Sequence, residues 1–547
     1  MSVVRPTPSG AAGEGRAGVT LETRRTTEAA NRSSHARLVR VTDEPEQFGS
    51  PNRPPASAWD PALAVAVEQA AAYLAGLQDR PVAERAGVDE LRKALAVALP
   101  DEPVDAAEVV RDLAEGAEPG LVATGSPRYF GFVIGGALPA ALAADWLAAT
   151  WDQNAGLYVG GPAAAVVEEV AGGWVLDLLG LPASASFGFV TGGQMANVTA
   201  LAAARHGVLA RAGWDVEKRG LNGAPPMRVL ASDVRHVTID RALRFLGLGT
   251  DAVTVVPSGP DARLWVDALA HALAAEPDRP AIVCAQAGEV NTGAIDPLAE
   301  ICEVAHAAGA WVHVDGAFGL WAGASPTMRP ALAGVERADS WATDFHKWLN
   351  VPYDSGFVAC ADTAAHSGAM GTRAAYLVHT DADADSHEGT DTGTAAPRDQ
   401  LDWNPEFSRR ARGFAVYAAL RSLGRQGVAD LVDRCCARAR QFAERLGRID
   451  GVEVLNDVAL DQVLVRFRQG TNGDAEDDAL TRRVVDAVQA SGDCWMSGTT
   501  WRGQAAMRIS VVNWQTTEAD VDRSVAAIQS CLSDVRQPGP AGRRAGT

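Results

Sequence analysis

Between Phe187 and Ala361, short strand-like segments alternate with helical ones, and this alternation restricts the possible folds more than any other feature of the chain. Strands separated by helices favour a mostly parallel sheet with helices on both faces. The expected strands are residues 187–190, 228–231, 252–256, 281–285, 310–314 and 356–361. In such sheets, ligands bind beyond the carboxyl ends of the strands. The sequence therefore predicts an α/β fold with a site at that edge.

The remaining chain divides by composition and periodicity. Residues 1–55 are rich in Arg, Gly, Ser, Thr and Pro and are expected to form a disordered or loosely docked extension. The other expected parts are an N-terminal helical segment (56–124), a large domain (125–430), a small C-terminal α+β domain (431–535) and a tail (536–547). In the last third we expect helices at 405–446, 478–491 and 517–533, and strands at 452–455, 461–467 and 506–512.

Composition excludes several classes of function. The formal charge of −19 argues against nucleic acid as a partner. No apolar run approaches the roughly 20 residues that cross a bilayer, and the N-terminus lacks the apolar core of a signal peptide. The seven cysteines include no CxxC pair and no zinc-ligand spacing, so we expect reduced thiols and no metal site. These observations predict a soluble protein of the cytoplasm.

The chemistry is indicated by a lysine and an aspartate. Lys347 lies in the run Asp344–Leu349, and 32 residues before it the apolar strand Ala310–Asp315 ends in a carboxylate. A pyridoxal phosphate enzyme needs an amine that forms a Schiff base with the cofactor's aldehyde. It also needs a carboxylate that keeps the pyridine nitrogen protonated. We predict Lys347 and Asp315 for these two roles.

Neighbouring motifs support a site for a phosphorylated cofactor. The segment Thr191–Asn197 follows a strand and opens a helix, and its glycines would expose backbone N–H groups to an anion. His313 shares a strand face with Asp315 and could support that carboxylate. Ala317 leaves room for a flat ring, and His346 could donate to a phosphate oxygen. Alone, the glycine segment is equally typical of a simple strand-to-helix turn, a lone aspartate at a strand end is more often a helix cap, and adjacent His-Lys pairs also occur on solvated loops.

These residues are arranged as in a known family: the chain resembles the group II pyridoxal phosphate-dependent decarboxylases, which include aromatic L-amino acid, glutamate and diaminobutyrate decarboxylases. The resemblance extends from about Ser126 to Val428 and less distinctly to Ser533. The motifs that carry it are residues 126–132, 161–164, 191–197, His236, 291–297, 313–317 and 344–348.

The resemblance implies fold type I, the aspartate-aminotransferase-like fold, in a homodimer with active sites at the subunit interface. The large domain would bind the cofactor. By position, Lys347 would form the Schiff base, Asp315 would pair with the pyridine nitrogen and His236 would stack on the ring. Ala317 would pack behind the ring. The phosphate would be held by Gly193, Gln194 and His346, although Gln194 replaces the small hydroxyl residue that is common there.

The family's usual proton donor has no counterpart here. In many members a tyrosine on a loop returns the proton to the α-carbon, and this position falls on Gln400. Replacement of that tyrosine is associated with oxidative deamination to an aldehyde. Substitute donors would be His236, His379 or His387, the last two expected to be solvated in a polar loop. Glu289-Val290 also departs from the threonines of the aromatic branch.

The sequence thus predicts decarboxylation of a small-molecule L-amino acid to its amine and carbon dioxide. Another pyridoxal phosphate reaction, either decarboxylation coupled to oxidative deamination or aminotransfer, is the first alternative. A catalytically silent cofactor-binding or scaffold protein is the second. Arg412 and Arg508 could each bind a substrate carboxylate or be structural.

Overall fold

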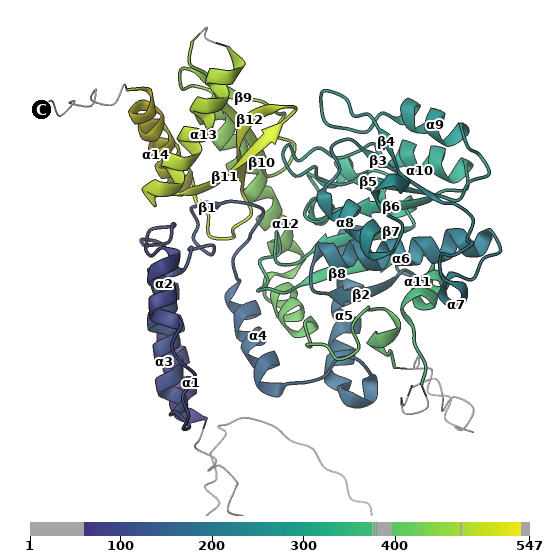
Figure 1. Cartoon of the computed structure of the whole chain (residues 1–547), viewed down its shortest axis with the longest axis horizontal. Coiled ribbons are helices and arrows are strands. Elements are labelled where there is room, and N and C mark those ends of the chain that lie inside the picture. The colour runs from purple at the N-terminus through teal and green to yellow at the C-terminus, as the bar shows by residue number, and fades with distance from the viewer. Residues whose placement is uncertain (1–58, 375–376, 378, 380–396, 471–472, 538–547) are drawn as a thin grey trace, which may run out of the picture. The chain divides into compact units, whose positions relative to one another are not determined.

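The computed structural model describes residues 59–374, 377, 379, 397–470 and 473–537, and Figure 1 shows the order of their elements. The extension predicted for residues 1–55 lies outside the described residues, as does most of the predicted C-terminal tail. Within the described part of the chain, no helix is both long enough and apolar enough to cross a membrane.

The first helices begin at residues suited to helix N-termini. They are α1 (Asp60–Gly76), α2 (Val88–Leu95), α3 (Ala106–Ala117), α4 (Pro139–Trp151) and α5 (Pro162–Leu179). Proline stands at one of the first two positions of α1, α4 and α5, where its missing N–H has no helical partner to lose. The Asp105 carboxylate caps α3 by accepting from the amides of Ala107 and Glu108.

A seven-stranded sheet forms the larger unit. In spatial order it contains β2 (Ser186–Val190), β8 (Gly356–Cys360), β7 (Ser340–Asp344), β6 (Trp311–Asp315), β5 (Ala281–Gln286), β3 (Arg228–Ser232) and β4 (Val253–Val256). β8 runs antiparallel to both of its neighbours, whereas the other pairs are parallel. The mostly parallel sheet predicted from the alternation is confirmed.

Helices cover both faces of this sheet, and alternate strand residues face opposite sides. In β5, Val283 and Ala285 share a hydrophobic cluster with α5, α9 (Val266–Ala274) and α10 (Leu298–Ala307). Ile282 and Cys284 instead pack in a cluster with α6 (Gly193–Arg211), α8 (Val237–Phe245) and α11 (Thr363–Met370). Burial on both faces explains why these strands are continuous apolar runs rather than alternating ones.

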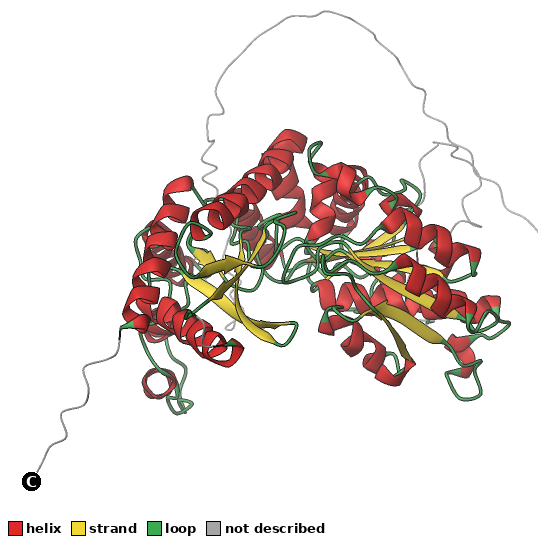
Figure 2. Ribbon diagram, turned by 90° about the horizontal axis from the view of Figure 1, so that it is seen from above, coloured by secondary structure: helices red, strands yellow, loops and turns green. Residues whose placement is uncertain are grey.

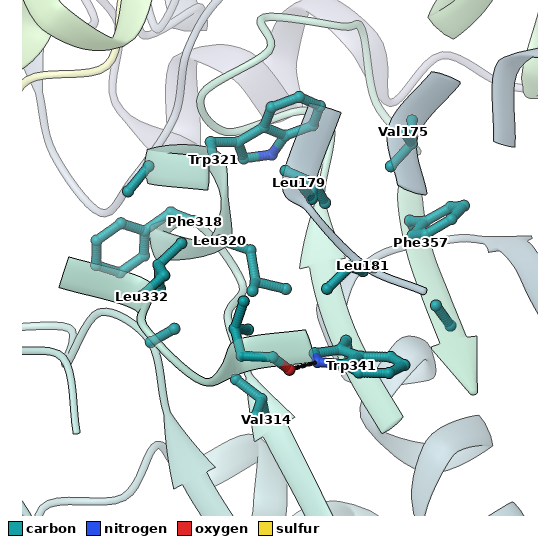
Figure 3. Packing of buried hydrophobic residues seen from close by; sticks show 14 of the residues in the cluster. Val175, Leu179, Leu181, Val314, Phe318, Leu320, Trp321, Leu332, Trp341 and Phe357 are labelled. Atoms are coloured by element: carbon teal, nitrogen blue, oxygen red, sulfur yellow. Dashed lines mark hydrogen bonds between the residues drawn. The ribbon is translucent and has the colours of Figure 1, made fainter. Parts of the chain in front are cut away.

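Figure 3 shows part of the first cluster, where Trp341 and Val314 on neighbouring strands lie beneath residues of α5 and of the short helix η5 (Gly319–Ala324). Trp341 is 1% exposed, and its indole Nε1 donates to Val335 O at 2.8 Å. The ring therefore adds apolar area to the core without leaving its N–H unsatisfied. The other short helices are η2 (Glu118–Gly120), η3 (Tyr158–Gly160), α7 (Val216–Arg219), η4 (Thr250–Ala252), η6 (Arg329–Leu332), η7 (Val335–Arg337) and η9 (Gln400–Asp402).

A separate five-stranded sheet forms the C-terminal α+β part, and Figure 2 shows the strands of the two sheets as distinct groups. Its spatial order is β1 (Tyr129–Phe130), β11 (Trp495–Trp501), β12 (Gln504–Ser510), β10 (Gln462–Phe467) and β9 (Val452–Val454). α13 (Asp474–Ser491) and α14 (Glu518–Arg536) pack on it through a second hydrophobic cluster. The predicted α+β character of this part is confirmed.

Two elements connect the sheets. β1 comes from the segment before the large sheet but pairs in parallel with β11. The long helix α12 (Gly413–Leu446) contributes Val416 and Leu420 to the core of the large sheet and Phe442 to the core of the small one. Gly424, at φ 62°, interrupts the helical conformation within the part that packs on the large sheet. The domain limits expected at 125, 430 and 535 stay a prediction.

Candidate active site

Three chain segments bring polar groups to one edge of the large sheet. Asp315 ends β6, Asp344 ends β7, and Gly193 begins α6 shortly after β2. β2, β6 and β7 run in the same direction, because β8 lies antiparallel between β2 and β7. Their carboxyl ends therefore meet at the edge where ligands of such sheets bind.

Lys347 lies in the turn after β7, with its amine 3.0 Å from Asp344 Oδ2. The chain contains two other lysines, Lys93 and Lys218. Both are exposed, and the side chain of Lys218 is 84% accessible against 20% for Lys347. Lys347 is thus the lysine that the fold encloses beside a carboxylate.

The turn that carries Lys347 is fixed through its backbone. Gly135 donates its N–H to His346 O at 3.3 Å, and a Cβ on this glycine would lie 2.0 Å from Lys347 O. Only glycine permits this close approach. Asn350, at φ 54°, donates its side-chain amide to Trp348 O and Val512 O, both at 2.8 Å. The lysine is therefore anchored both to the 126–138 segment and to the chain just after β12.

Asp315 is held by two donors. Asn197 Nδ2 donates to its Oδ2 at 3.0 Å, and the backbone N–H of Ala317 is 3.3 Å from its Oδ1. The predicted support by His313 is indirect, because His313 Nε2 bonds to Asn197 Oδ1 at 2.9 Å rather than to Asp315. Ala317 also accepts from the amide of Asp344 at 2.9 Å, which ties the ends of β6 and β7 together.

His236 caps α8, as its ring accepts from the Thr238 amide. Its Nδ1 also lies 2.8 Å from Thr238 Oγ1. Burial lowers the pKa of His236, while the nearby Asp315 carboxylate acts in the opposite direction. His236 is therefore a neutral imidazole beside Asp315 at neutral pH.

His346 lies under an aromatic ring. Its Nδ1 is 2.9 Å from Ser355 O, and Tyr353 covers it with ring centroids 4.3 Å apart. Burial lowers the pKa of His346, and the neighbouring Asp344 partly opposes this shift. At neutral pH and without a bound anion, this imidazole is therefore uncharged, and its single proton is donated from Nδ1 to Ser355 O.

The start of α6 has the form of an anion cradle. Gly192 occupies the N-cap and has no side chain to cap the first-turn N–H groups, of which that of Gly193 donates to Asp344. The Gly193 amide donates to Asp344 Oδ1 at 2.5 Å, and a Cβ there would lie 2.7 Å from Asp344 Oδ2. Gln194 turns its side chain toward α8 and donates to Thr238 O at 3.3 Å.

Together these groups fit pyridoxal phosphate. The enclosed amine of Lys347 suits the aldehyde. The carboxylate of Asp315, which accepts two hydrogen bonds, suits a protonated pyridine nitrogen, and the N-terminus of α6 suits the phosphate. The glycines at this N-terminus have no side chains that would keep a phosphate away from the backbone N–H groups. The predicted site residues lie within one connected set of contacts.

Other candidates from the sequence are engaged elsewhere. Arg412 Nε pairs with Asp354 at 2.7 Å, and Arg508 donates to Phe132 O at 3.2 Å. Both Glu289 carboxylate oxygens accept from Asn291 and Thr292, so this residue closes the turn after β5. These contacts give Arg412 and Glu289 clear structural roles.

The residues considered as proton donors differ in position. Gln400 is 1% exposed and donates its amide to Ala165 O at 3.2 Å, so its side chain is bound to α5. The expectation that His379 is solvated is wrong: it is 5% exposed, with Nδ1 3.5 Å from Asp399. His387 lies outside the described residues.

The sequence pattern did not assign roles to three residues of this site. Asp344 joins Lys347 to α6, and Asn197 joins Asp315 to His313. Asp461 is fully buried just before β10, and burial raises its pKa to about 7 against the opposing effect of Lys347 and Arg508. Asp344 and Asn197 stand inside the motifs that predicted the site, whereas Asp461 lies 114 positions beyond Lys347 and carries no local signal.

The site geometry agrees with comparisons to known proteins. The family model described as the pyridoxal-dependent decarboxylase conserved domain matches residues 89–469. The chain is 26% identical over 463 residues to an aromatic-L-amino-acid decarboxylase of Bacillus atrophaeus, covering 84% of this chain and 92% of the relative. It is 27% identical over 478 residues to a phenylacetaldehyde synthase of a Rosa hybrid cultivar, covering 84% and 90%.

Among solved structures, Oryza sativa TDC with PLP and tryptamine superposes with a TM-score of 0.81 at 25% identity, covering 90% of this chain and all of that one. The fold is therefore fold type I, as the resemblance implied. The family match spans more than half of the sequence and includes every predicted site residue. The chain belongs to the pyridoxal-dependent decarboxylase family, and its cofactor is pyridoxal 5′-phosphate.

Proposed function

We propose that this enzyme decarboxylates an L-amino acid to its amine and carbon dioxide, with Lys347 as the residue that binds the cofactor's aldehyde. The observation that carries the proposal is the enclosure of the Lys347 amine, 3.0 Å from Asp344, at the strand edge where Asp315 and the α6 N-terminus also lie. Lys93 and Lys218 are exposed and lie in no comparable setting.

Bound pyridoxal phosphate supplies an electron sink for the pair of electrons released when the carboxylate leaves. Asp315 would sustain this sink, because Asn197 and the Ala317 amide each donate to one of its oxygens and so orient the carboxylate for a protonated ring nitrogen. His236, neutral and half-buried, would lie against the ring. The N–H groups of Gly193 and Gln194 would hold the phosphate, and His346 would join them as an imidazolium favoured by the phosphate charge, since its Nδ1 proton is already donated to Ser355 O. Ala317 would pack behind the ring.

The second candidate reaction is decarboxylation coupled to oxidative deamination, with an aldehyde as product. Gln400 favours it, because this residue stands where the resemblance places a tyrosine and its amide is a poor acid. Its side chain is also bound to Ala165 O, away from a role in proton transfer. The similarity to a phenylacetaldehyde synthase supports the same candidate.

One experiment separates these reactions. The pyridoxal phosphate-loaded protein is incubated with pooled L-amino acids, and amine, aldehyde, keto acid and carbon dioxide are measured with and without oxygen. Amine and carbon dioxide in equal amounts, independent of oxygen, are the expected products. Aldehyde that forms only with oxygen would replace the first reaction by the second. Keto acid without carbon dioxide would indicate aminotransfer, and no product from any amino acid would contradict both.

The proposed enzyme is a homodimer of the cytoplasm. Of the twenty-five large hydrophobic side chains exposed in the described residues, nineteen lie between Trp59 and Val170. Such a concentration of apolar surface is typical of a face that another subunit covers. The seven cysteine thiols, none of which forms a disulfide in the described structure, support a reducing compartment.

A further inference from the structure

Asn197 occupies the centre of a buried hydrogen-bond network next to Asp315. Its Nδ2 donates to Asp315 Oδ2 at 3.0 Å and to Thr238 Oγ1 at 3.1 Å, and its Oδ1 lies 2.9 Å from His313 Nε2. Asn197 is 1% exposed and His313 is fully buried, so water does not compete for these groups. Every polar atom of the Asn197 side chain therefore has a protein partner.

The direction of each hydrogen bond follows from its partners. An ionised Asp315 can only accept, so the amide nitrogen of Asn197 must face it and the amide oxygen must face His313. His313 must then carry its proton on Nε2. Burial lowers the pKa of His313 to about 4, so the ring is neutral and its Nδ1 is free to accept.

The far side of His313 completes the chain. Its Nδ1 lies 3.0 Å from Ser340 Oγ, and the same oxygen accepts from Trp311 Nε1 at 2.9 Å. Because the indole N–H can only donate, the hydroxyl proton of Ser340 is left for His313. Trp311 and Ser340 are both buried. The relay thus runs in one direction, from Trp311 through Ser340, His313 and Asn197 to the carboxylate.

The second proton of Asn197 reaches Thr238, and this branch also has a fixed direction. Thr238 Oγ1 accepts from Asn197, so its own proton is available to His236 Nδ1 at 2.8 Å. A reversed amide would place its oxygen against an Asp315 oxygen that has no proton to offer, whereas the Thr238 hydroxyl can either donate or accept. The orientation of Asn197 is therefore determined by Asp315, and His313 and Thr238 take the matching donor and acceptor roles.

We infer that Asn197 is a positioning residue that keeps Asp315 an oriented, acceptor-only carboxylate for the ring nitrogen of the cofactor. The inference rests on the proposed role of Asp315. It assigns no direct contact between Asn197 and the cofactor. It explains why a buried strand, β6, has a histidine at position 313, which would otherwise be an isolated polar group in an apolar core.

The test compares two ligands that differ at the ring nitrogen. Dissociation constants of the full-length protein are measured for pyridoxal phosphate and for its 1-deaza analogue, in which carbon replaces that nitrogen. The quantity of interest is the preference for pyridoxal phosphate over the analogue. The variants are Asn197→Leu, the isosteric Asn197→Asp and Asp315→Asn. Thr199→Val is the control, because this buried hydroxyl on the same helix bonds only to Met195 O.

We expect the preference to fall about tenfold in Asp315→Asn and in both Asn197 variants, since hydrogen bonds to charged groups have about this effect. Thr199→Val should stay within about twofold of the unchanged protein. If Asn197→Leu does not fold, the isosteric Asn197→Asp decides.

An unchanged preference in the Asn197 variants, with a reduced one in Asp315→Asn, would overturn the inference alone. If the Asn197 variants weaken the binding of both ligands equally, the inference is overturned as well, because the residue would then be purely structural. An unchanged preference in Asp315→Asn would instead remove the proposed role of Asp315.

Discussion

At the scale of single residues, Lys347 is unusually easy to test because the sequence contains only two other lysines. Reduction of the loaded protein with borohydride should link the cofactor irreversibly to Lys347, as mass spectrometry of the peptides would show. Lys347→Ala should lose the visible absorbance of the bound cofactor, whereas Lys93→Ala and Lys218→Ala should keep it. Label on Lys93 or Lys218, or an unchanged spectrum in Lys347→Ala, would contradict the assignment.

Asp461 predicts a pH dependence of stability at the same scale. Its pKa is raised from 3.8 to about 7 by burial, so between these values the folded protein binds a proton that the unfolded chain releases. Stability must then fall as pH rises from about 4 to about 7 and level off above that range. Asp461→Asn should remove this loss and so raise the free energy of unfolding at pH 8 by up to roughly 4 kcal/mol relative to the unchanged protein.

The measurement is the free energy of unfolding in denaturant at pH 4 to 8 for both proteins. The gain of Asp461→Asn over the unchanged protein should grow with pH and then become constant. Asp457→Asn, at an exposed position four residues earlier, provides the control. A gain that does not vary with pH would show that Asp461 is ionised throughout this range.

At the scale of elements, substitution of two helical glycines should have different effects, one on cofactor binding and the other on stability. A Cβ at Gly193 would lie 2.7 Å from Asp344 Oδ2 at the start of α6, whereas a Cβ at Gly173 on α5 would meet no atom within 4 Å. Gly193→Ala should therefore weaken pyridoxal phosphate binding about tenfold or more, by displacing Asp344 and narrowing the anion cradle. Gly173→Ala should leave binding unchanged and stabilise the protein by ~0.5–1 kcal/mol.

Cofactor titration and thermal unfolding of the two variants check this contrast. Equal binding by Gly193→Ala and the unchanged protein would show that the phosphate does not lie at the α6 N-terminus. A lower unfolding temperature for Gly173→Ala would contradict the packing of α5.

At the scale of the whole molecule, the concentration of exposed hydrophobic residues between Trp59 and Val170 predicts a dimer interface in that part of the chain. Sedimentation velocity should give about twice the chain mass of 57.2 kDa. Leu113→Asp, at a 60% exposed position on α3, should shift the equilibrium toward the monomer. Phe245→Asp, at a 58% exposed position outside that segment, should not. A monomer at all concentrations would refute the proposed dimer.

Local sequence determined much of this protein, because the information lies within a few residues. Apolar runs bounded by turns predicted β2, β3, β5, β6 and β8, since strands buried on both faces need continuous apolar side chains. The valine-rich run of β4 predicted an edge strand that is only partly buried. The lysine turn and the glycines before α6 indicated where a cofactor would bind. β7 and β11 were missed because Ser340, Thr343 and Thr499 make their sequences polar, and only pairing with neighbouring strands makes them strands.

Tertiary structure alone decided which distant groups meet. Packing of α12 and the small sheet near Lys347 buries Asp461, and this burial raises its pKa to about 7. No local sequence pattern predicts that burial. Support of Asp315 by His313 was predicted from strand alternation, and it is indirect because α6 inserts Asn197 between them. Hydrogen-bond direction depends on which donors and acceptors are enclosed together. That enclosure arises only when the helices have packed on the sheet.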